Sequence, residues 1–160
     1  MAKKGKQKVD HSPRLLNRRA RHDYFLSDFI ECGMALLGSE VKALRAGQGN
    51  LGEAFARISP RGELELHNFH IDPYRKSGIA YQHEPLRAKK LLVHKREIRK
   101  LDEATREKGT SLIPTSVYWK GGRAKVELAV AKGKKEHDKR ETLKRKVQDR
   151  EIRRAMTVKQ

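Results

Sequence analysis

The sequence has a single cysteine, Cys32, in 160 residues. One thiol cannot form an internal disulfide, and a zinc site built on a Cys-x-x-Cys pair is excluded. We expect Cys32 to be a small buried hydrophobic residue. No apolar run approaches the roughly 20 residues of a membrane-spanning helix. The opening Met-Ala-Lys-Lys-Gly-Lys also lacks the apolar stretch of a secretory signal. These absences predict a cytoplasmic protein.

Acidic side chains are scarce relative to basic ones, with 20 Asp and Glu against 38 Lys and Arg and a formal net charge of +18. The excess is uneven. Residues 1–21 carry eight basic and one acidic side chain, and residues 132–160 carry twelve and five, whereas the charges between them nearly balance. Two basic arms on a nearly balanced body are typical of a nucleic-acid-binding protein. A membrane surface fits less well, because the arms lack a Trp, Phe and Leu face that would insert into lipid.

Residue patterns of common enzyme classes are missing as well. The segment Gly47-Gln-Gly49 does not continue into the Gly-Lys-Ser/Thr of a phosphate-binding loop. Some side chains have suitable chemistry without a recognised catalytic context. They are a possible nuclease cluster of His22, Asp23, Glu31 and Glu40 and the spaced pair His67 and His70. We therefore expect no enzymatic activity, no metal site and no cofactor, and an RNA-processing enzyme is kept as an alternative.

Alternating apolar and polar residues predict several short antiparallel strands. The clearest pair is a hairpin over 111–120 and 123–132 across Gly121-Gly122, in which Pro114 indicates an edge or a bulge. On its second strand, Val126 and Leu128 should face the core, and Arg123 and Lys125 should alternate outward. Further strands are expected over 22–37, 51–58 and 63–69.

Helices are expected between these strands. One begins with Ser39 as a good N-cap and closes at Gly47, and a second covers about 94–108. Residues 14–21 predict a short helical turn, and Gly33 indicates a bulge or bend in its strand. The pattern favours a mainly β fold, an antiparallel OB-like β-barrel with short flanking helices and a basic C-terminal tail. An α+β sandwich is the alternative architecture.

Three segments are expected along the chain. They are a disordered basic N-terminal arm (1–13), an OB-like RNA-binding barrel (14–132) and a basic tail (133–160). The tail has little apolar surface to bury, so it should be mobile when alone, and its charge fits a polyanionic partner. A tail that only confers solubility is the alternative, and His137 and Asp138 inside the cationic run argue against it.

Several basic stretches have side chains suited to RNA. Residues 17–24 combine cations and an amide with an imidazole and a phenol, which can pair phosphates or stack on unpaired bases. Lys42 and Arg45 share one side of a predicted helix. Lys89 and Lys90 stand beside apolar residues in 87–95. Each stretch could equally be a solvated charged face.

Six blocks in this order resemble the signature blocks of the SsrA-binding protein family, small protein B (SmpB). They are Asn-Arg-Arg-Ala-Arg-His-Asp-Tyr (17–24), Gly-Ser-Glu-Val-Lys-Ala-Leu-Arg-Ala-Gly (38–47), Asn-Phe-His-Ile-Asp-Pro-Tyr (68–74), Lys-Lys-Leu-Leu-Val-His-Lys (89–95), Ser-Val-Tyr-Trp-Lys (116–120) and Ala-Lys-Gly-Lys-Lys-Glu-His-Asp-Lys-Arg (131–140). The resemblance implies a monomeric, non-enzymatic partner of transfer-messenger RNA in bacterial ribosome rescue. Its barrel would bind the tRNA-like domain of that RNA. A general ribosome-associated rRNA-binding protein is the alternative outside this family.

The resemblance also implies which residues contact RNA. On the barrel they would be Asn17, Arg19, His22, Tyr24, Glu31, Arg45, Lys90, Leu91 and Lys125. Glu31 cannot pair a phosphate, so it would orient cations, accept from a base or hold its strand. Leu91 would touch a base or act as an internal anchor.

The tail has a second role by the same resemblance. It would become helical in the empty mRNA channel of a stalled ribosome, beside 16S rRNA at the decoding centre. The residues concerned would be Gly133, Lys134, Lys135, His137, Asp138, Lys139 and Arg140. In physical terms, Gly133 would be a hinge, His137 would stack on a base, and residues 138–155 would form the helix.

Overall fold

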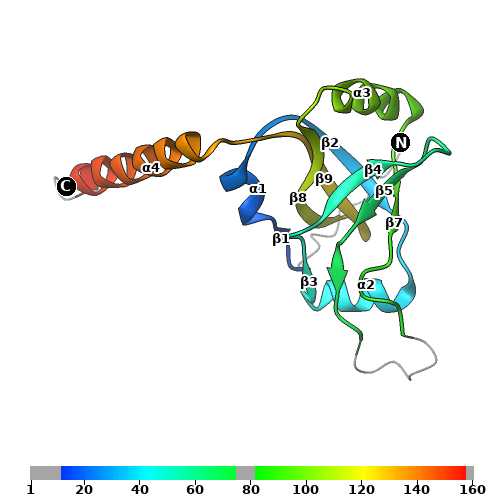
Figure 1. Cartoon of the computed structure of the whole chain (residues 1–160). Coiled ribbons are helices and arrows are strands. Elements are labelled where there is room, and N and C mark those ends of the chain that lie inside the picture. The colour runs from blue at the N-terminus through cyan, green and yellow to red at the C-terminus, as the bar shows by residue number, and fades with distance from the viewer. Residues whose placement is uncertain (1–11, 75–81, 158–160) are drawn as a thin grey trace, which may run out of the picture.

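The structure, a computed structural model, describes residues 12–74 and 82–157 of the chain. A body of strands carries short helices on its outside, and one long helix projects away from it (Figure 1). The strands are β1 (Leu15–Leu16), β2 (Tyr24–Met34), β3 (Gly49–Asn50), β4 (Phe55–Ile58), β5 (Leu64–His67), β6 (His70–Ile71), β7 (Lys89–Leu92), β8 (Thr110–Lys120) and β9 (Arg123–Gly133). The helices are α1 (Arg18–Asp23), α2 (Gly38–Arg45), α3 (Lys95–Thr105) and α4 (Glu136–Thr157). The expected N-terminal arm lies almost wholly outside the described residues.

The body is a closed ring of antiparallel strands. The main sheet runs in the order β1-β8-β4-β5-β7-β2-β9, and β8 also pairs with β9, which closes the ring. Apolar side chains fill its interior, among them Phe69, Leu128 and Cys32, all fully buried. Burial raises the pKa of the Cys32 thiol to about 12, so this cysteine is an inert core residue. The prediction of an antiparallel OB-like barrel is confirmed.

The hairpin of β8 and β9 forms as the sequence indicates. Lys120 pairs with Arg123, and the two glycines between them have positive φ angles of 58° and 74°, which residues with a side chain rarely adopt. Val126 and Leu128 are buried, whereas Arg123 and Lys125 lie on the outer face. The register shifts between Pro114 and Ser116, as expected for a proline that has no N–H to donate.

Three local predictions are wrong. The helical turn expected over 14–21 forms only from Arg18 onward, in α1, whereas Leu15–Leu16 is a strand paired with Val117 and Ser116 of β8. The irregularity of β2 falls between Ser27 and Ile30, where Asp28 has φ 46°, while Gly33 pairs regularly. Helix α2 is capped at Leu37 rather than at Ser39, so Ser39 is its second residue.

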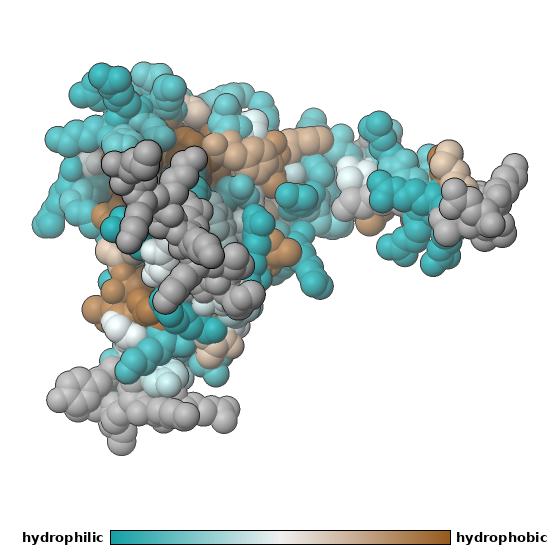
Figure 2. Space-filling view, turned by 180° about the vertical axis from the view of Figure 1, so that it is seen from behind, coloured by the Kyte–Doolittle hydropathy of each residue, from teal (hydrophilic) through white to brown (hydrophobic). Residues whose placement is uncertain are grey.

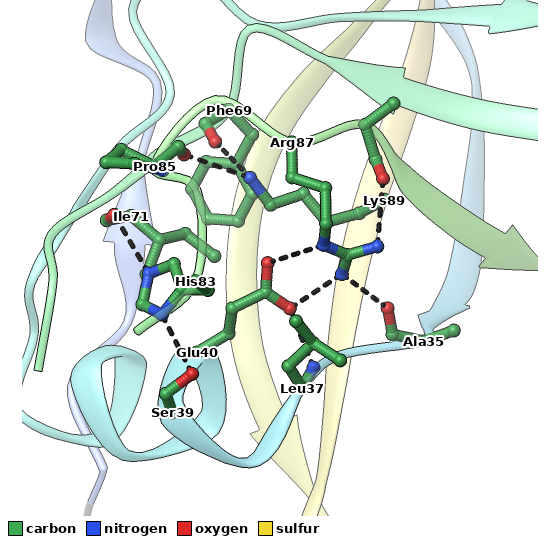
Figure 3. A network of polar contacts seen from close by, with 11 residues as sticks. Ala35, Leu37, Ser39, Glu40, Phe69, Ile71, His83, Pro85, Arg87 and Lys89 are labelled. Atoms are coloured by element: carbon green, nitrogen blue, oxygen red, sulfur yellow. Dashed lines mark hydrogen bonds and ion pairs between the residues drawn. The ribbon is translucent and has the colours of Figure 1, made fainter. Parts of the chain in front are cut away.

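A buried ion pair holds α2 against the chain that precedes β7 (Figure 3). Glu40 is fully buried, and Arg87 donates to its two carboxylate oxygens at 3.2 and 2.7 Å. The Leu37 N–H donates to the same carboxylate at 2.7 Å, which gives the first turn of α2 an acidic cap. A buried charge needs such partners, so this pairing positions α2 and Arg45 at its end.

Lys89 is buried although it stands at the start of an exposed basic stretch. Its Nζ donates to the carbonyl oxygens of Phe69 at 2.6 Å and Pro85 at 3.2 Å (Figure 3). Burial lowers the pKa of its amine to about 8. The same segment is held by His83, which lies between Ser39 Oγ at 2.9 Å and the Ile71 carbonyl at 3.1 Å. Lys89 therefore has an internal role and offers no charge to a partner.

Helix α4 covers the residues 138–155 predicted to be helical and extends beyond them at both ends. It projects from the body, and its surface is mainly hydrophilic with isolated apolar side chains (Figure 2). Leu143, Val147 and Ile152 are all exposed. No helix in residues 12–74 or 82–157 is both long and apolar enough to cross a membrane. The helix thus forms without a packing partner on the body along most of its length.

Candidate nucleic-acid interface

A cluster of charged and phenolic side chains lies on the outer face of β2, β8 and β9. Tyr118 Oη donates to Glu31 Oε2 at 2.5 Å, and Lys120 Nζ lies 3.1 Å from the same oxygen. Lys125 Nζ lies 3.4 Å from Glu31 Oε1. These residues come from three neighbouring strands, so the closed ring brings them together. Glu31 and Lys125, both expected to contact RNA, therefore lie side by side on this face.

Glu31 acts as the centre of this cluster. The hydrogen bond from Tyr118, followed by that from Lys120, lowers the pKa of the Glu31 carboxyl to about 2. Burial and the Glu31 carboxylate raise the pKa of the Tyr118 phenol to about 12, so it stays a neutral donor. The carboxylate is therefore ionised, and it orients Lys120 and Lys125 on the outer face. This matches the first of the roles considered for Glu31.

Arg45 and Lys90 lie near this face but make separate contacts. The Arg45 guanidinium lies 4.7 Å from the centroid of the Trp119 ring, a cation–π geometry. Lys90 Nζ pairs with Glu63 at 2.5 Å. Both side chains reach the surface from elements that flank the cluster, α2 and β7.

Leu91 requires a correction. Its side chain is only 3% exposed and belongs to the core, whereas the next residue, Leu92, is 54% exposed. The reason is the alternation of side chains along β7, which buries Lys89 and Leu91 and turns Lys90 and Leu92 outward. Leu91 is thus the internal anchor, and Leu92 is the apolar side chain available on the surface.

Asn17 also has an internal role. Only 6% of it is exposed, and its amide donates to the carbonyls of Leu51 at 2.9 Å and Pro114 at 3.0 Å. Its side-chain oxygen accepts from the Ala20 N–H at 3.1 Å and so caps α1. Every polar atom of this side chain is used within the fold. Asn17 is therefore a positioning residue for α1 and for the RNA-suited residues on it.

Three predicted residues on or next to α1 reach the surface. Arg19 is exposed and pairs with Glu53. Tyr24 is partly buried against Ala20, and with Arg19 it lines an open groove of about 660 Å³ between α1 and β4. His22 is partly exposed, and its Nδ1 lies 2.8 Å from Asp23 Oδ1. This α1 surface is separate from the Glu31 cluster.

Asp23 connects α1 to the tail. The same Oδ1 that contacts His22 lies 3.0 Å from Lys139 Nζ. These two contacts, that of His22 first, lower the pKa of the Asp23 carboxyl. In addition, the Lys134 N–H donates to the Asp23 carbonyl at 2.9 Å. The first turn of α4 is thereby held beside the helix that carries His22.

The tail residues are divided between this connection and the solvent. Gly133 pairs with Tyr24 at the end of β9, so it is the last residue of a strand rather than a free hinge. Lys134 Nζ donates to the Arg21 carbonyl at 3.1 Å and lies 5.0 Å from the Phe25 ring centroid. The remaining contacts are local: Asp138 accepts from the Lys135 N–H at 3.0 Å, and Arg140 pairs with Glu136 at 2.8 Å. His137 lies within α4, and its side chain is outside the described part.

The two histidines considered as metal ligands, His67 and His70, each contact a different acidic side chain. His67 lies 3.4 Å from Glu65, and His70 lies 3.3 Å from Asp72. Among residues 12–74 and 82–157, no three His, Cys, Asp or Glu side chains gather in a way that could hold a metal ion.

Some residues of the site were not found from the sequence. Tyr118 and Trp119 occur in a quoted block, yet their contacts with Glu31 and Arg45 depend on strands and helices distant in sequence. Asp23 could have been noticed as the one acid in the basic stretch 17–24. Its partners in the structure are His22 and, from the tail, Lys139.

Comparison with known proteins identifies the family. A family model described as "SmpB protein" matches residues 14–158. The chain belongs to the SmpB family. The range shared with the SmpB model includes every strand and helix of the described structure, α4 among them. The resemblance seen in the six sequence blocks is confirmed.

Individual SmpB relatives are similar over most of the chain. The SsrA-binding protein of Geobacillus thermodenitrificans is 52% identical over 90% of this chain and 92% of the relative. That of Bacillus subtilis is 53% identical over 87% and 88%, respectively. A chain in a solved structure described as "tmRNA-SmpB: a journey to the center of the bacterial ribosome" is 47% identical, with a TM-score of 0.66 over 78% of this chain and 86% of that chain.

Proposed function

We propose that this chain is a non-enzymatic RNA-binding protein of the bacterial cytoplasm. It binds the tRNA-like domain of transfer-messenger RNA and delivers that RNA to stalled ribosomes for trans-translation. The relatives that span about nine-tenths of the chain are SsrA-binding proteins, and the similar solved chain belongs to a tmRNA–SmpB complex with the ribosome. The observation that carries the proposal is the Glu31 cluster on a chain of this family.

The Glu31 cluster supports RNA binding on physical grounds. Its carboxylate holds Lys120 and Lys125 on one outer strand face. Because these lysines are already held in place, they lose less side-chain freedom when they contact successive phosphates. Strand faces of OB-like barrels are also the surfaces that commonly meet nucleic acid. The surface residues of α1, Arg19 and His22, form a second area suited to the same RNA.

The tail supports the second half of the proposal. Lys135, just before α4, and Arg140, near the start of α4, are exposed, and the helix follows closely on the barrel. We expect α4, which is already helical in the chain alone, to enter an empty mRNA channel, where rRNA phosphates offset the repulsion among its cations. An mRNA strand in the channel would compete with it, so the tail would report an unoccupied channel.

The proposal is tested by sequencing the RNA that co-purifies with the tagged full chain. We expect transfer-messenger RNA to dominate, and we expect Lys125→Ala to reduce its recovery. Lys108→Ala removes the same charge from an exposed position beyond α3 and serves as the matched control. Recovery of rRNA without enrichment of transfer-messenger RNA would contradict the proposal and favour a general rRNA-binding protein. RNA cleavage by the purified chain with Mg²⁺ would favour the enzyme alternative.

A further inference from the structure

Two aromatic rings lie stacked on the outer face of β4 and β5. The ring centroids of Phe55 and His67 are 5.5 Å apart, and the interplanar angle is 19°. The two residues are opposite each other in the strand register, so their side chains point to the same side of the sheet. Phe55 is 38% exposed, and His67 is partly exposed. Together with Arg57 on the same face, this pair is termed the β4–β5 platform.

The stacked rings do not serve the core. Side chains on the other face of the two strands, those of Ala56, Leu64 and Leu66, are the buried ones. His67 covers one side of the Phe55 ring, and Phe55 also lines the open groove between α1 and β4, so there is space beside the ring for a further planar group. An exposed aromatic ring held in place in this way is a surface on which a nucleobase can stack.

Arg57 gives the platform an uncompensated charge. It follows Phe55 by two residues, so the alternation of side chains along β4 turns both outward. Glu65 is opposite Arg57 in the register, yet its carboxylate contacts His67 Nε2 at 3.4 Å. Among residues 12–74 and 82–157, no carboxylate lies within ion-pair distance of Arg57. The guanidinium is therefore available to a phosphate next to a stacked base.

Further cations continue from Arg57 towards α3. A hollow of about 470 Å³ between the β4–β5 turn and α3 is lined by Arg61, Lys95 and Arg99. In the described part of the chain these three side chains have no ion-pair partner either. Lys95 is the first residue of α3, where the helix dipole disfavours a positive charge. Folding therefore gains little from these charges, whereas a polyanion would compensate them.

The platform lies across the barrel from the Glu31 cluster. In the ring, β9 and β8 separate β2 from β4 on one side, and β7 and β5 separate them on the other. An RNA domain seated on the Glu31 cluster therefore faces away from the platform. Apart from the two-residue β1, β4 and β5 are the second and third strands of the ring in chain order. In OB folds this pair of strands commonly forms the face that meets oligonucleotides.

We propose that the β4–β5 platform binds an unpaired nucleotide of ribosomal RNA, with its base stacked on Phe55 and a flanking phosphate on Arg57. The backbone on one side of this nucleotide would continue past Arg61 and Arg99. Stacked rings followed by a line of cations are the arrangement that single-stranded RNA needs, which favours RNA over an acidic protein segment. The ribosome is the source because the platform faces away from the RNA at the Glu31 cluster, and for this source alone the inference rests on the proposed function.

The test uses the full chain saturated with a transcript of the tRNA-like domain, so that the Glu31 cluster is occupied. The probe is a fluorescein-labelled adenosine oligonucleotide of about nine nucleotides, within the usual site size of one OB fold. We expect its fluorescence anisotropy to rise without displacement of the transcript. Phe55→Leu keeps an apolar side chain and removes the ring, so it should weaken oligonucleotide binding about 5- to 150-fold, as for one lost base–aromatic stack.

Two further variants make the test specific. Arg57→Ala should weaken binding and lower the slope of log affinity against log salt by about one, even if Phe55→Leu perturbs β4. Phe29→Leu is the matched control, because it removes another exposed phenylalanine from β2, across the barrel, and it should bind the oligonucleotide like the parent. Melting temperatures confirm that each variant is folded.

Cross-linking identifies the source of the nucleotide. Phe55→Cys is labelled with an azidophenacyl group, and Cys32 stays unlabelled because it is buried. The labelled chain is bound to ribosomes together with transfer-messenger RNA and irradiated. Sequencing of the cross-linked RNA should return ribosomal RNA, and cross-links to transfer-messenger RNA alone would overturn the ribosomal source.

The outcomes separate this inference from the proposed function. Parental oligonucleotide affinity in both Phe55→Leu and Arg57→Ala would overturn the platform as an RNA site, and so would full displacement of the oligonucleotide by the transcript. Displacement by a glutamate-rich peptide at lower concentrations than by RNA would overturn it in favour of a protein partner. If the parent chain fails to bind the transcript while oligonucleotide binding still depends on Phe55, the proposed function is wrong and the platform stands.

Discussion

Acidic side chains have different roles in this chain according to whether they are buried or lie on the surface. Glu40 is fully buried and holds α2 through Arg87, whereas Glu31 lies on the outer face and organises Tyr118 and two lysines. Removing Glu40 would leave the partly buried Arg87 without its partner and disturb the fold. Removing Glu31 would release surface cations and leave the core intact. Glu31 is thus the better residue for testing the site apart from stability of the core.

The Glu31 cluster predicts a pH dependence of stability. The folded-state pKa of Glu31, about 2, lies below its ordinary value of 4.5. Its contribution is therefore fully present above pH 4.5 and is lost as the pH falls from 4.5 towards 2. Glu31→Gln should reduce the loss of unfolding free energy within this window, measured by urea titration at each pH. An unchanged profile would show that the carboxylate is not held as described.

Arg45 predicts an effect on RNA affinity. Arg45→Ala removes the cation over Trp119 from an exposed helix end, so it should weaken binding of the tRNA-like transcript by about 1–3 kcal/mol. Arg61→Ala, in the exposed turn between β4 and β5, removes the same charge and should have a smaller effect. Equal losses in both variants would indicate that only net charge matters.

At the scale of elements, local patterns predicted the parts whose partners are near in sequence. The hairpin of β8 and β9 was predicted because alternation and Gly121-Gly122 lie within one segment. The strand Leu15–Leu16 was missed because its partner lies about one hundred residues away. The burial of Lys89 was missed for a related reason, since the carbonyl of Phe69 that accepts from it belongs to another part of the ring.

Prediction of the candidate site was limited in the same way, because its contacts join residues that are distant in sequence. Glu31 and Lys125 were placed on one surface by family resemblance, and the strand register explains why they meet. Asn17 and Leu91 were named by the same resemblance, but they serve the fold. The resemblance therefore indicates which residues matter, and the distances are needed to separate contact residues from residues that position them.

The ion pair between α1 and α4 predicts that the orientation of α4 relative to the barrel depends on the charges of Asp23 and Lys139. The ion pair of Asp23 and Lys139 is partly exposed and worth about 0.2–1 kcal/mol, so its loss should shift a population of helix orientations. Lys139→Asp should broaden the distance distribution between spin labels at Arg18→Cys and Lys144→Cys. Native Cys32 does not interfere because it is buried with a pKa raised to about 12.

A charge exchange provides the control. Asp23→Lys combined with Lys139→Asp restores an opposite pair at the same two positions, so the narrow distribution should return. A distribution that stays broad in the exchanged chain would mean that Lys139 acts elsewhere. A narrow distribution in Lys139→Asp alone would mean that the backbone contact of Lys134 with Asp23 suffices.

At the scale of the whole molecule, two parts of different character are joined. The barrel buries its apolar residues in a closed ring, while α4 leaves Leu143, Val147 and Ile152 exposed. A helix that buries so little adds little to the stability of the barrel. A chain stopped after Lys135 keeps all of β9 and the contacts of Lys134. We therefore expect it to retain its melting temperature and most of its affinity for the tRNA-like transcript.

We propose that the barrel holds the RNA and that the tail acts only on the ribosome. It is tested most directly by peptide transfer to transfer-messenger RNA on ribosomes stalled at the end of a truncated mRNA, with the RNA saturated by the chain stopped after Lys135. We expect transfer to be lost although the RNA is bound, because the cations of α4 are absent from the empty channel. Transfer at the rate of the full chain would contradict it.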